Sequence, residues 1–188
     1  VVNTINYSEQ LLPIYKKHLQ PDDINIGKIY NNLGFSYKNQ NNYKKAIQYL
    51  ELALPIYKKH YEPHDIRIGY IYNNLGNSYY NEKAIQYLEL ALPIFKKHLQ
   101  PDDIDIGYIY NKLGTSYYYQ QNNEKAIENL ELALPIYKKY YEQDNINIGY
   151  IYNNLGISYY NQQNNEKATQ YFELALPIFK KHKQTHII

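Results

Sequence analysis

The sequence predicts an all-α protein, an α-solenoid of antiparallel helix pairs with nine helices in total. The first observation is repetition, because the segment Ala53–His60 returns with small changes as Ala91–His98, Ala133–Tyr140 and Ala175–His182. The second is a proline in each copy, at steps of 42, 38, 42 and 42 residues: Pro13, Pro55, Pro93, Pro135 and Pro177. The third is the lack of any strand pattern. Such a period is typical of stacked units that cannot bury their apolar faces alone.

We expect a single solenoid over residues 1–188, in which a lone second helix at 1–20 precedes four repeats at 21–62, 63–100, 101–142 and 143–188. In the first repeat, Asp22 and Asp23 are suitable N-caps for a first helix. Apolar residues then recur at steps of three and four, which predicts an amphipathic helix: Ile26, Ile29, Tyr30, Leu33 and Tyr37. Gly34 lies within it and is expected where the two helices of the pair approach closely.

The second helix of the repeat follows a polar turn, Gln40-Asn41-Asn42, in which Asn tolerates the left-handed backbone that ends a helix. Its apolar residues again have helical spacing: Ala46, Ile47, Leu50, Ala53, Leu54 and Tyr57. Lys58-Lys59-His60 closes it with cations at the negative end of the helix dipole. Pro55 falls inside this helix, where it removes one backbone hydrogen bond, so a kink is expected there.

The repeat at 63–100 is four residues shorter than the others, and the loss falls in its turn. Asn81 matches Tyr119 and Glu82 matches Glu124, so the counterparts of residues 120–123 are missing. Two antiparallel helices cannot be joined by a single peptide bond. Either one helix of this pair is shorter by about a turn, or the sequence lacks residues at this point.

Composition excludes several classes of protein. The net charge of +2 is too small for an evident polyanion-binding protein, and the absence of cysteine excludes disulfides. No apolar run approaches the roughly 18 residues that span a membrane, and no signal peptide is apparent, so we expect a cytoplasmic protein without membrane contacts. The chain begins Val1-Val2 and contains no methionine, so we expect a piece of a longer protein.

The repeat resembles a known family. The run Tyr72-Asn73-Asn74-Leu75-Gly76-Asn77-Ser78-Tyr79, followed by Ala84 and Ala91, is similar to the tetratricopeptide repeat (TPR), and the other three repeats carry the same residues. The usual period of that repeat is about 34 residues. The period of 42 here, with linkers such as Pro101-Asp102-Asp103, resembles the kinesin-light-chain subclass. The prolines and the turns without glycine depart from the usual pattern.

This resemblance implies a superhelix whose concave wall is lined by the first helix of each pair. Asn side chains can bond a peptide backbone and Tyr side chains add apolar area with a hydroxyl. Relatives that clamp a C-terminal carboxylate have Asn or a cation before Leu-Gly, a position occupied here by Asn32, Asn74, Lys112 and Asn154. The implied peptide-binding residues are Lys28, Asn32, Tyr70, Asn74, Tyr108, Lys112, Tyr150 and Asn154.

The resulting hypothesis is a non-enzymatic scaffold that binds a protein or linear peptide with an acidic residue or a free C-terminus. The alternative is a structural or self-associating solenoid, in which the Asn side chains bond one another and stiffen the stack. A third possibility, nucleic-acid binding, would need residues that vary at fixed positions, whereas Asn73 and Asn74 repeat Asn31 and Asn32.

No catalytic set, phosphate-binding loop or cofactor motif can be assembled from these residues. His18, His60, His98 and His182 recur at one position and could suggest a metal site. They are about one repeat apart, too far to share an ion at about 2 Å, so we expect them to cap helices. No metal and no cofactor are therefore expected.

Overall fold

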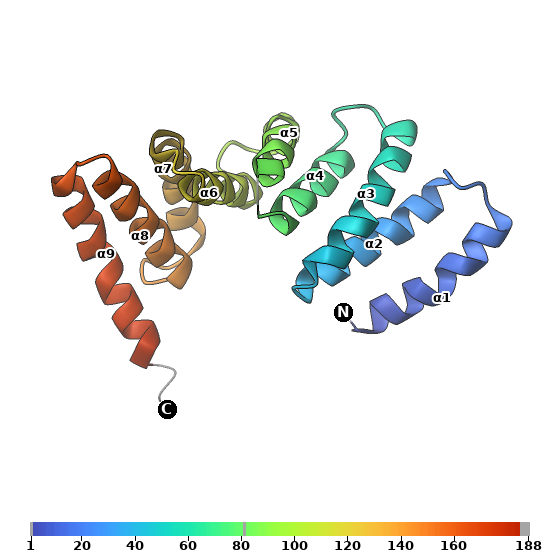
Figure 1. Ribbon diagram of the computed structural model, residues 1–188, viewed down its shortest axis with the longest axis horizontal. Coiled ribbons are helices and arrows are strands. Elements are labelled where there is room, and N and C mark those ends of the chain that lie inside the picture. The colour runs from blue at the N-terminus through green and yellow to red at the C-terminus, as the bar shows by residue number, and fades with distance from the viewer. Residues whose placement is uncertain (1, 81, 185–188) are drawn as a thin grey trace. The chain divides into compact units, whose positions relative to one another are not determined.

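The computed structural model describes residues 2–80 and 82–184, and within these ranges it contains nine α-helices and no strand. The helices are α1 (Val2–His18), α2 (Ile24–Asn39), α3 (Tyr43–His60), α4 (Ile66–Ser78), α5 (Glu82–His98), α6 (Ile104–Tyr119), α7 (Asn123–Tyr140), α8 (Ile146–Asn161) and α9 (Asn165–Gln184) (Figure 1). The predicted all-α class is confirmed. The five recurring prolines all lie inside helices, one each in α1, α3, α5, α7 and α9.

The helices form two compact units, one ending at His98 and the other beginning at Leu99. The N-terminal unit holds α1 to α5 and the C-terminal unit holds α6 to α9. We call the first helix of each pair helix A and the second helix B. Each helix A packs on its own helix B, and α2, α4 and α8 also pack on the helix B before them, which is α1, α3 and α7 respectively.

The core of each pair is formed as the helical spacing predicts. Leu33, Ala46, Leu50 and Ala53 are fully buried, and their counterparts in the later pairs are almost all buried as well. Gly34 allows the two helices to approach, because a Cβ atom at this position would lie 2.5 Å from Leu50 Cγ. Helix-interior glycine is unfavourable by about 1 kcal/mol against alanine, so close packing explains its place here.

Each helix A begins at a side-chain cap. The caps accept a hydrogen bond from the backbone N–H two residues later, at 2.8 to 2.9 Å, and they are Asp23, Asp65, Asp103 and Asn145. The prediction that Asp22 also caps α2 is wrong, because Asp22 instead forms an ion pair with Lys59 at the end of α3. This capping satisfies one of the N–H groups that a helix leaves without a partner at its start.

The turn from helix A to helix B uses one left-handed residue, and in the first repeat this is Asn41, one of the two asparagines of the predicted turn, with φ of 58°. Gln121 and Gln163 take the same conformation with φ of 61° and 63°. The backbone N–H of Asn42 then donates to the carbonyl of Tyr37 at 2.9 Å, and this bond closes the end of α2.

The shortened repeat has a shortened helix A. Helix α4 has 13 residues and ends at Ser78, whereas α2, α6 and α8 have 16 residues each. The backbone of Tyr79 is extended, so this side chain is only half-buried, while Tyr37, Tyr117 and Tyr159 are each 6% exposed. The repeated pattern that places Tyr37 in the core also predicts a buried Tyr79, and for Tyr79 this prediction is wrong. The bond from Asn81 to Glu82 involves Asn81, which lies outside the described residues.

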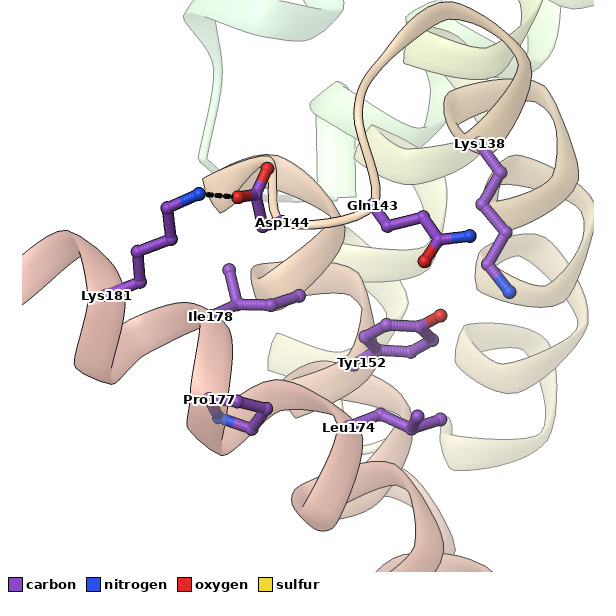
Figure 2. A pocket seen from close by; sticks show the side chains of 8 residues that line it. All are labelled: Lys138, Gln143, Asp144, Tyr152, Leu174, Pro177, Ile178 and Lys181. Carbon is purple, nitrogen blue, oxygen red and sulfur yellow. Dashed lines mark hydrogen bonds and ion pairs between the residues drawn. The ribbon is translucent and has the colours of Figure 1, made fainter.

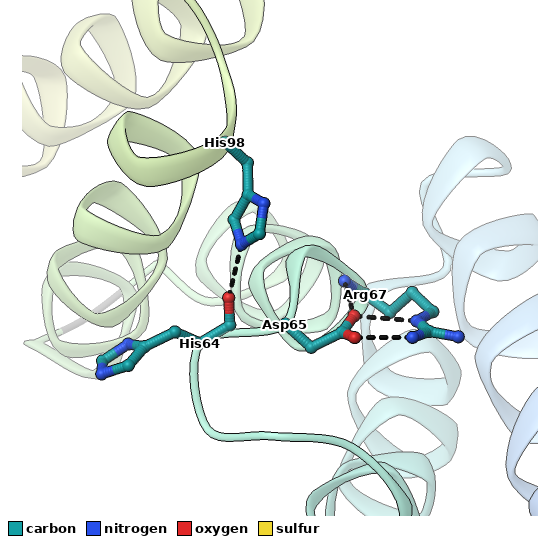
Figure 3. A network of polar contacts seen from close by, with 4 residues as sticks. All are labelled: His64, Asp65, Arg67 and His98. Atoms are coloured by element: carbon teal, nitrogen blue, oxygen red, sulfur yellow. Dashed lines mark hydrogen bonds and ion pairs between the residues drawn. The ribbon is translucent and has the colours of Figure 1, made fainter.

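His60 and His98, in the last turns of α3 and α5, bond to a loop and not to the end of their own helix, which corrects the capping prediction for these two residues. The Nε2 atoms of His60, His98 and His182 lie 2.7 to 2.9 Å from backbone carbonyl oxygens in the loop before helix A of the same repeat. Figure 3 shows this contact between His98 and the carbonyl of His64. Lysines beside these positions pair with the loop aspartates, as Lys59 does with Asp22 and Lys181 with Asp144. These contacts fasten the loop to the end of helix B.

Asp65 differs from the other caps because it also holds an arginine. Arg67 Nε donates to Asp65 Oδ1 at 2.8 Å, and Arg67 Nη2 donates to Oδ2 at 2.6 Å (Figure 3). These bonds lower the pKa of the Asp65 carboxyl from 3.8 to about 2. A carboxyl with a depressed pKa stabilises the fold above its ordinary pKa, and this contribution is lost as the pH falls through the lower value.

We therefore expect Asp65→Asn to destabilise the protein at neutral pH, by less than about 1 kcal/mol because Arg67 is half exposed. The difference from the wild type should disappear as the pH falls through about 2. Urea unfolding across this pH range measures it. Asp103→Asn removes a capping carboxylate without a paired arginine and serves as the control. An equal pH dependence for both variants would contradict the role of Arg67.

Candidate functional site

The residues predicted to bind a peptide all lie on A helices. In the N-terminal unit, Lys28 and Asn32 are exposed on α2, whereas Tyr70 is 41% exposed and Asn74 is 7% exposed on α4. In the C-terminal unit, α6 carries Tyr108 and Lys112 and α8 carries Tyr150 and Asn154. Tyr108 is 40% exposed and Tyr150 is 55% exposed, while Lys112 and Asn154 are half-buried.

Asn74 is engaged within the protein. Its Oδ1 atom accepts a hydrogen bond of 2.9 Å from Lys38 Nζ, which joins α4 to the neighbouring helix A, α2. Burial lowers the pKa of the Lys38 ammonium, and this ammonium also lies 4.7 Å from the centre of the Phe35 ring. At this one position the Asn side chain joins two helices of the protein, as in the alternative hypothesis of a stiffened stack. Its signal in the sequence is weak, because Lys38 lacks an equivalent cation in the other repeats.

The three predicted tyrosines share a different support. Each ring packs against the aromatic ring of its own helix B, with centre-to-centre distances of 4.9 Å for Tyr70 and Phe95, 5.4 Å for Tyr108 and Tyr137, and 5.3 Å for Tyr150 and Phe179. Aromatic pairs in such edge-on and tilted arrangements are favourable. Each tyrosine is therefore supported on one side by the fold, and 40 to 55% of its surface remains exposed.

The hydroxyl of Tyr108 forms a hydrogen bond with the hydroxyl of Tyr141. Burial and this bond raise the pKa of Tyr108 to about 12, so the phenol is neutral at physiological pH. Asn111 is bonded inward, because its Nδ2 atom donates to the hydroxyl of Tyr137 at 3.2 Å. The chemical character of the face is thus neutral phenol and amide, with Lys112 as its cation in the C-terminal unit.

Within each unit the two A helices contact one another, α2 with α4 and α6 with α8. The fold therefore brings the predicted residues of each unit onto neighbouring helices. That all eight residues line one channel remains a prediction.

The sequence did not predict a cavity on the helix B side of the C-terminal unit. It has a volume of about 490 Å³ and opens beside the loop between α7 and α8 (Figure 2). Its lining is formed by Lys138, Gln143, Asp144, Tyr152, Leu174, Pro177, Ile178 and Lys181. In the sequence, the recurrence of lysine and proline in every helix B could have pointed to this cavity. None of the eight predicted residues contributes to this lining.

Over the described ranges, no three His, Cys, Asp or Glu side chains come close enough together to hold a metal ion. A separate property concerns membranes: none of the helices described here combines the length and the apolar character needed to cross one.

Comparisons with known proteins identify the class of this fold. The family model described as Tetratricopeptide repeat matches residues 25–97 and 105–181, which is most of the chain. The chain therefore belongs to the tetratricopeptide repeat family, and its fold is of the kinesin-light-chain-like type. No curated protein matches the sequence.

Three solved structures show the breadth of this likeness. BtubC (BKLC) from P. vanneervenii has a TM-score of 0.76 at 24% identity, over 95% of this chain and 74% of its own. A protein described as a kinesin light chain, from Podosopora anserina, gives 0.72 at 19%, over 95% of this chain and 86% of its own. Aspartyl phosphate phosphatase F from Bacillus subtilis gives 0.65 at 21%, over 94% of this chain and 46% of its own. At these identities the likeness concerns the fold alone.

Proposed function

We propose that this protein is a non-catalytic scaffold that binds an extended peptide along the exposed faces of its A helices. The family is one of protein-interaction scaffolds, and the fold supports that general role. The observation that carries the specific proposal is a tyrosine that recurs at one position of helix A, as Tyr70, Tyr108 and Tyr150. Each of these rings packs against an aromatic ring of its own helix B. Rings that are already fixed lose little side-chain entropy when a ligand binds.

The charge of the face favours a peptide with an acidic side chain or a free C-terminus. Lys112 is half-buried on α6, where a carboxylate brought to it would be partly shielded from water. Charge-assisted hydrogen bonds in such surroundings are stronger than those between exposed side chains. Lys28, exposed on α2, adds a second cation to the A-helix face of the N-terminal unit.

We expect Lys112→Glu to weaken binding of an acidic peptide by more than the roughly 1 kcal/mol of an exposed ion pair. Screening an unbiased peptide library against the wild type and this variant, followed by calorimetric titration of the hits, measures the effect. Lys44→Glu makes the same charge change at an exposed position of α3 and is the matched control. Identical ligands and affinities for all three proteins would overturn the proposal.

The alternative is a structural or self-associating solenoid. The hydrogen bond from Lys38 to Asn74 favours it, because it employs a predicted ligand-binding amide to join two helices. Sedimentation of the full chain over a range of concentrations distinguishes the two. A library without any binder, together with reversible assembly of the chain, would favour the alternative.

A further inference from the structure

The cavity beside the loop between α7 and α8 has an apolar end and a polar end. Helix α9 forms the apolar end, where Ile178 is buried and Leu174 is 48% exposed, together with the ring of Pro177. Tyr152 of α8 is buried between the two ends, and its hydroxyl points toward Lys138 (Figure 2). The volume of about 490 Å³ lies in the range of small-molecule binding sites, which are mostly apolar with a few polar groups.

Three hydrogen-bond donors form the polar end: the Lys138 ammonium, the Gln143 side-chain amide and the Tyr152 hydroxyl (Figure 2). Lys138 Nζ lies 5.4 Å from the centre of the Tyr152 ring. None of the three donors makes a hydrogen bond or an ion pair elsewhere within residues 2–80 and 82–184. Asp144 also lines the cavity, but its carboxylate is paired with Lys181. The lining therefore has two lysines and one aspartate, and its uncompensated charge is that of Lys138.

The contact of lysine with tyrosine is a structural feature that recurs. Where α2, α4 and α8 pack on the helix B before them, the ammonium of a helix B lysine lies 5.4 to 5.5 Å from the ring centre of the first tyrosine of helix A, in Lys16 and Tyr30, Lys58 and Tyr72, and Lys138 and Tyr152. The second tyrosine donates to a helix B glutamate at 2.5 to 2.6 Å, in Tyr37 and Glu9, Tyr79 and Glu51, and Tyr159 and Glu131. These contacts orient the rings and join the helices. They do not distinguish the cavity from the other interfaces.

Gln143 distinguishes this repeat from the others. The same position is proline in the other three loops, as Pro21, Pro63 and Pro101, and proline has no side-chain donor. The equivalent place in the N-terminal unit, beside Pro63, therefore has the lysine and the tyrosine but lacks the amide. Because one repeat of the four carries this additional donor, the arrangement favours a compact ligand held at one place over a long polymer that contacts every repeat.

We propose that this cavity binds a small carboxylic acid with an apolar body. The carboxylate accepts hydrogen bonds from Lys138, Gln143 and Tyr152, and it compensates the charge of the ammonium. The apolar body lies on the α9 end of the cavity and removes the exposed part of Leu174 from water. This site is separate from the A-helix face, because none of the eight residues predicted to bind a peptide lines it.

The test uses the full chain with labelled leucine and isoleucine methyl groups, whose NMR signals are followed as hexanoate is added at neutral pH. We expect saturable shifts for Leu174 and Ile178, whereas Leu90 and Ile94, the equivalent residues of α5, should not shift. Hexan-1-ol has the same chain without the charge and should bind at least about tenfold more weakly, because hydrogen bonds to charged groups are the stronger ones. Hexylammonium should not bind, because Lys138 repels it.

Three variants test the polar end. Lys138→Met removes the ammonium and should weaken hexanoate binding at least about tenfold, while Gln143→Pro installs the residue of the other loops and should weaken it about threefold. Lys58→Met removes the equivalent lysine beside Tyr72 and should leave binding unchanged, so it is the matched control. Circular dichroism shows whether each variant is folded. Equal losses for Lys138→Met and Lys58→Met would overturn the proposal.

The ligands themselves provide the remaining decisive outcomes. Equal affinity for hexanoate and hexan-1-ol, equal shifts in α5, or the absence of saturable shifts at Leu174 would overturn the proposal. A dipeptide with a free C-terminal leucine tests another source of the same chemistry, and binding at least about tenfold tighter than hexanoate would assign the cavity to a chain terminus instead. Lys112→Glu should leave hexanoate binding unchanged, so the outcome here is independent of peptide binding on the A helices.

Discussion

Replacing Phe95 with alanine is expected to lower the free energy of unfolding by about 3–5 kcal/mol, the usual cost of deleting a buried aromatic ring. Phe95 is fully buried in α5, and its ring supports Tyr70 at 4.9 Å. It also packs against the backbone of α4, where a Cβ atom on Gly69 would lie 3.0 Å from Phe95 Cε2. A cavity at this point removes contacts with both helices of the pair.

Thermal and urea unfolding followed by circular dichroism would measure this loss. Phe95→Leu keeps much of the apolar volume and should cost less, while Tyr80→Ala removes a ring that is 73% exposed and should cost little. The loss of the ring beneath Tyr70 should also increase the mobility of that side chain. Equal stability for Phe95→Ala and Tyr80→Ala would show that this core is not closely packed.

Leu75→Ala is expected to destabilise the protein by about 2–5 kcal/mol if its site cannot collapse. Leu75 is fully buried in α4, beside Gly76, where a Cβ atom would lie 2.6 Å from Leu88 Cγ. Leu90→Ala is the matched control, because Leu90 is 48% exposed on α5. The same unfolding measurement applies, and a loss below about 0.5 kcal/mol at Leu75 would contradict the helical phase assigned to α4.

The fold was predictable from the sequence because it repeats local rules. A capping Asp or Asn, apolar residues at steps of three and four, and a polar turn occur in the same order in nearly every unit. The core of one pair is therefore identified by Leu33, Gly34 and Ala46, and the same spacing identifies their counterparts in the other pairs. The polar turn between the two periodic segments indicated a left-handed asparagine there, but it did not distinguish Asn41 from Asn42.

Contacts between elements were harder to predict. Periodicity assigns a residue to a face of a helix, but it does not say which loop or helix lies opposite. The bond from Lys38 to Asn74 and the contact of His98 with the carbonyl of His64 depend on the distance between elements. The exposure of Tyr79 depends on where α4 ends. For the candidate site, the sequence identified the A helices, while the aromatic support beneath Tyr70 was visible only in the structure.

Three interfaces, in which α2, α4 and α8 each pack on the helix B before them, have a consequence for the evolution of this chain. Each joins the same residue types, Glu and Lys on one side and Tyr-x-x-Leu-Gly-x-Ser-Tyr on the other, so side chains do not specify which helix A belongs on which helix B. The order of the helices is determined by covalent connection, since a short loop keeps its two helices at high effective concentration. Duplicating or removing one whole repeat of 42 residues would leave every remaining interface chemically complete. The number of repeats is thus a property that unequal recombination can change without redesign of any surface.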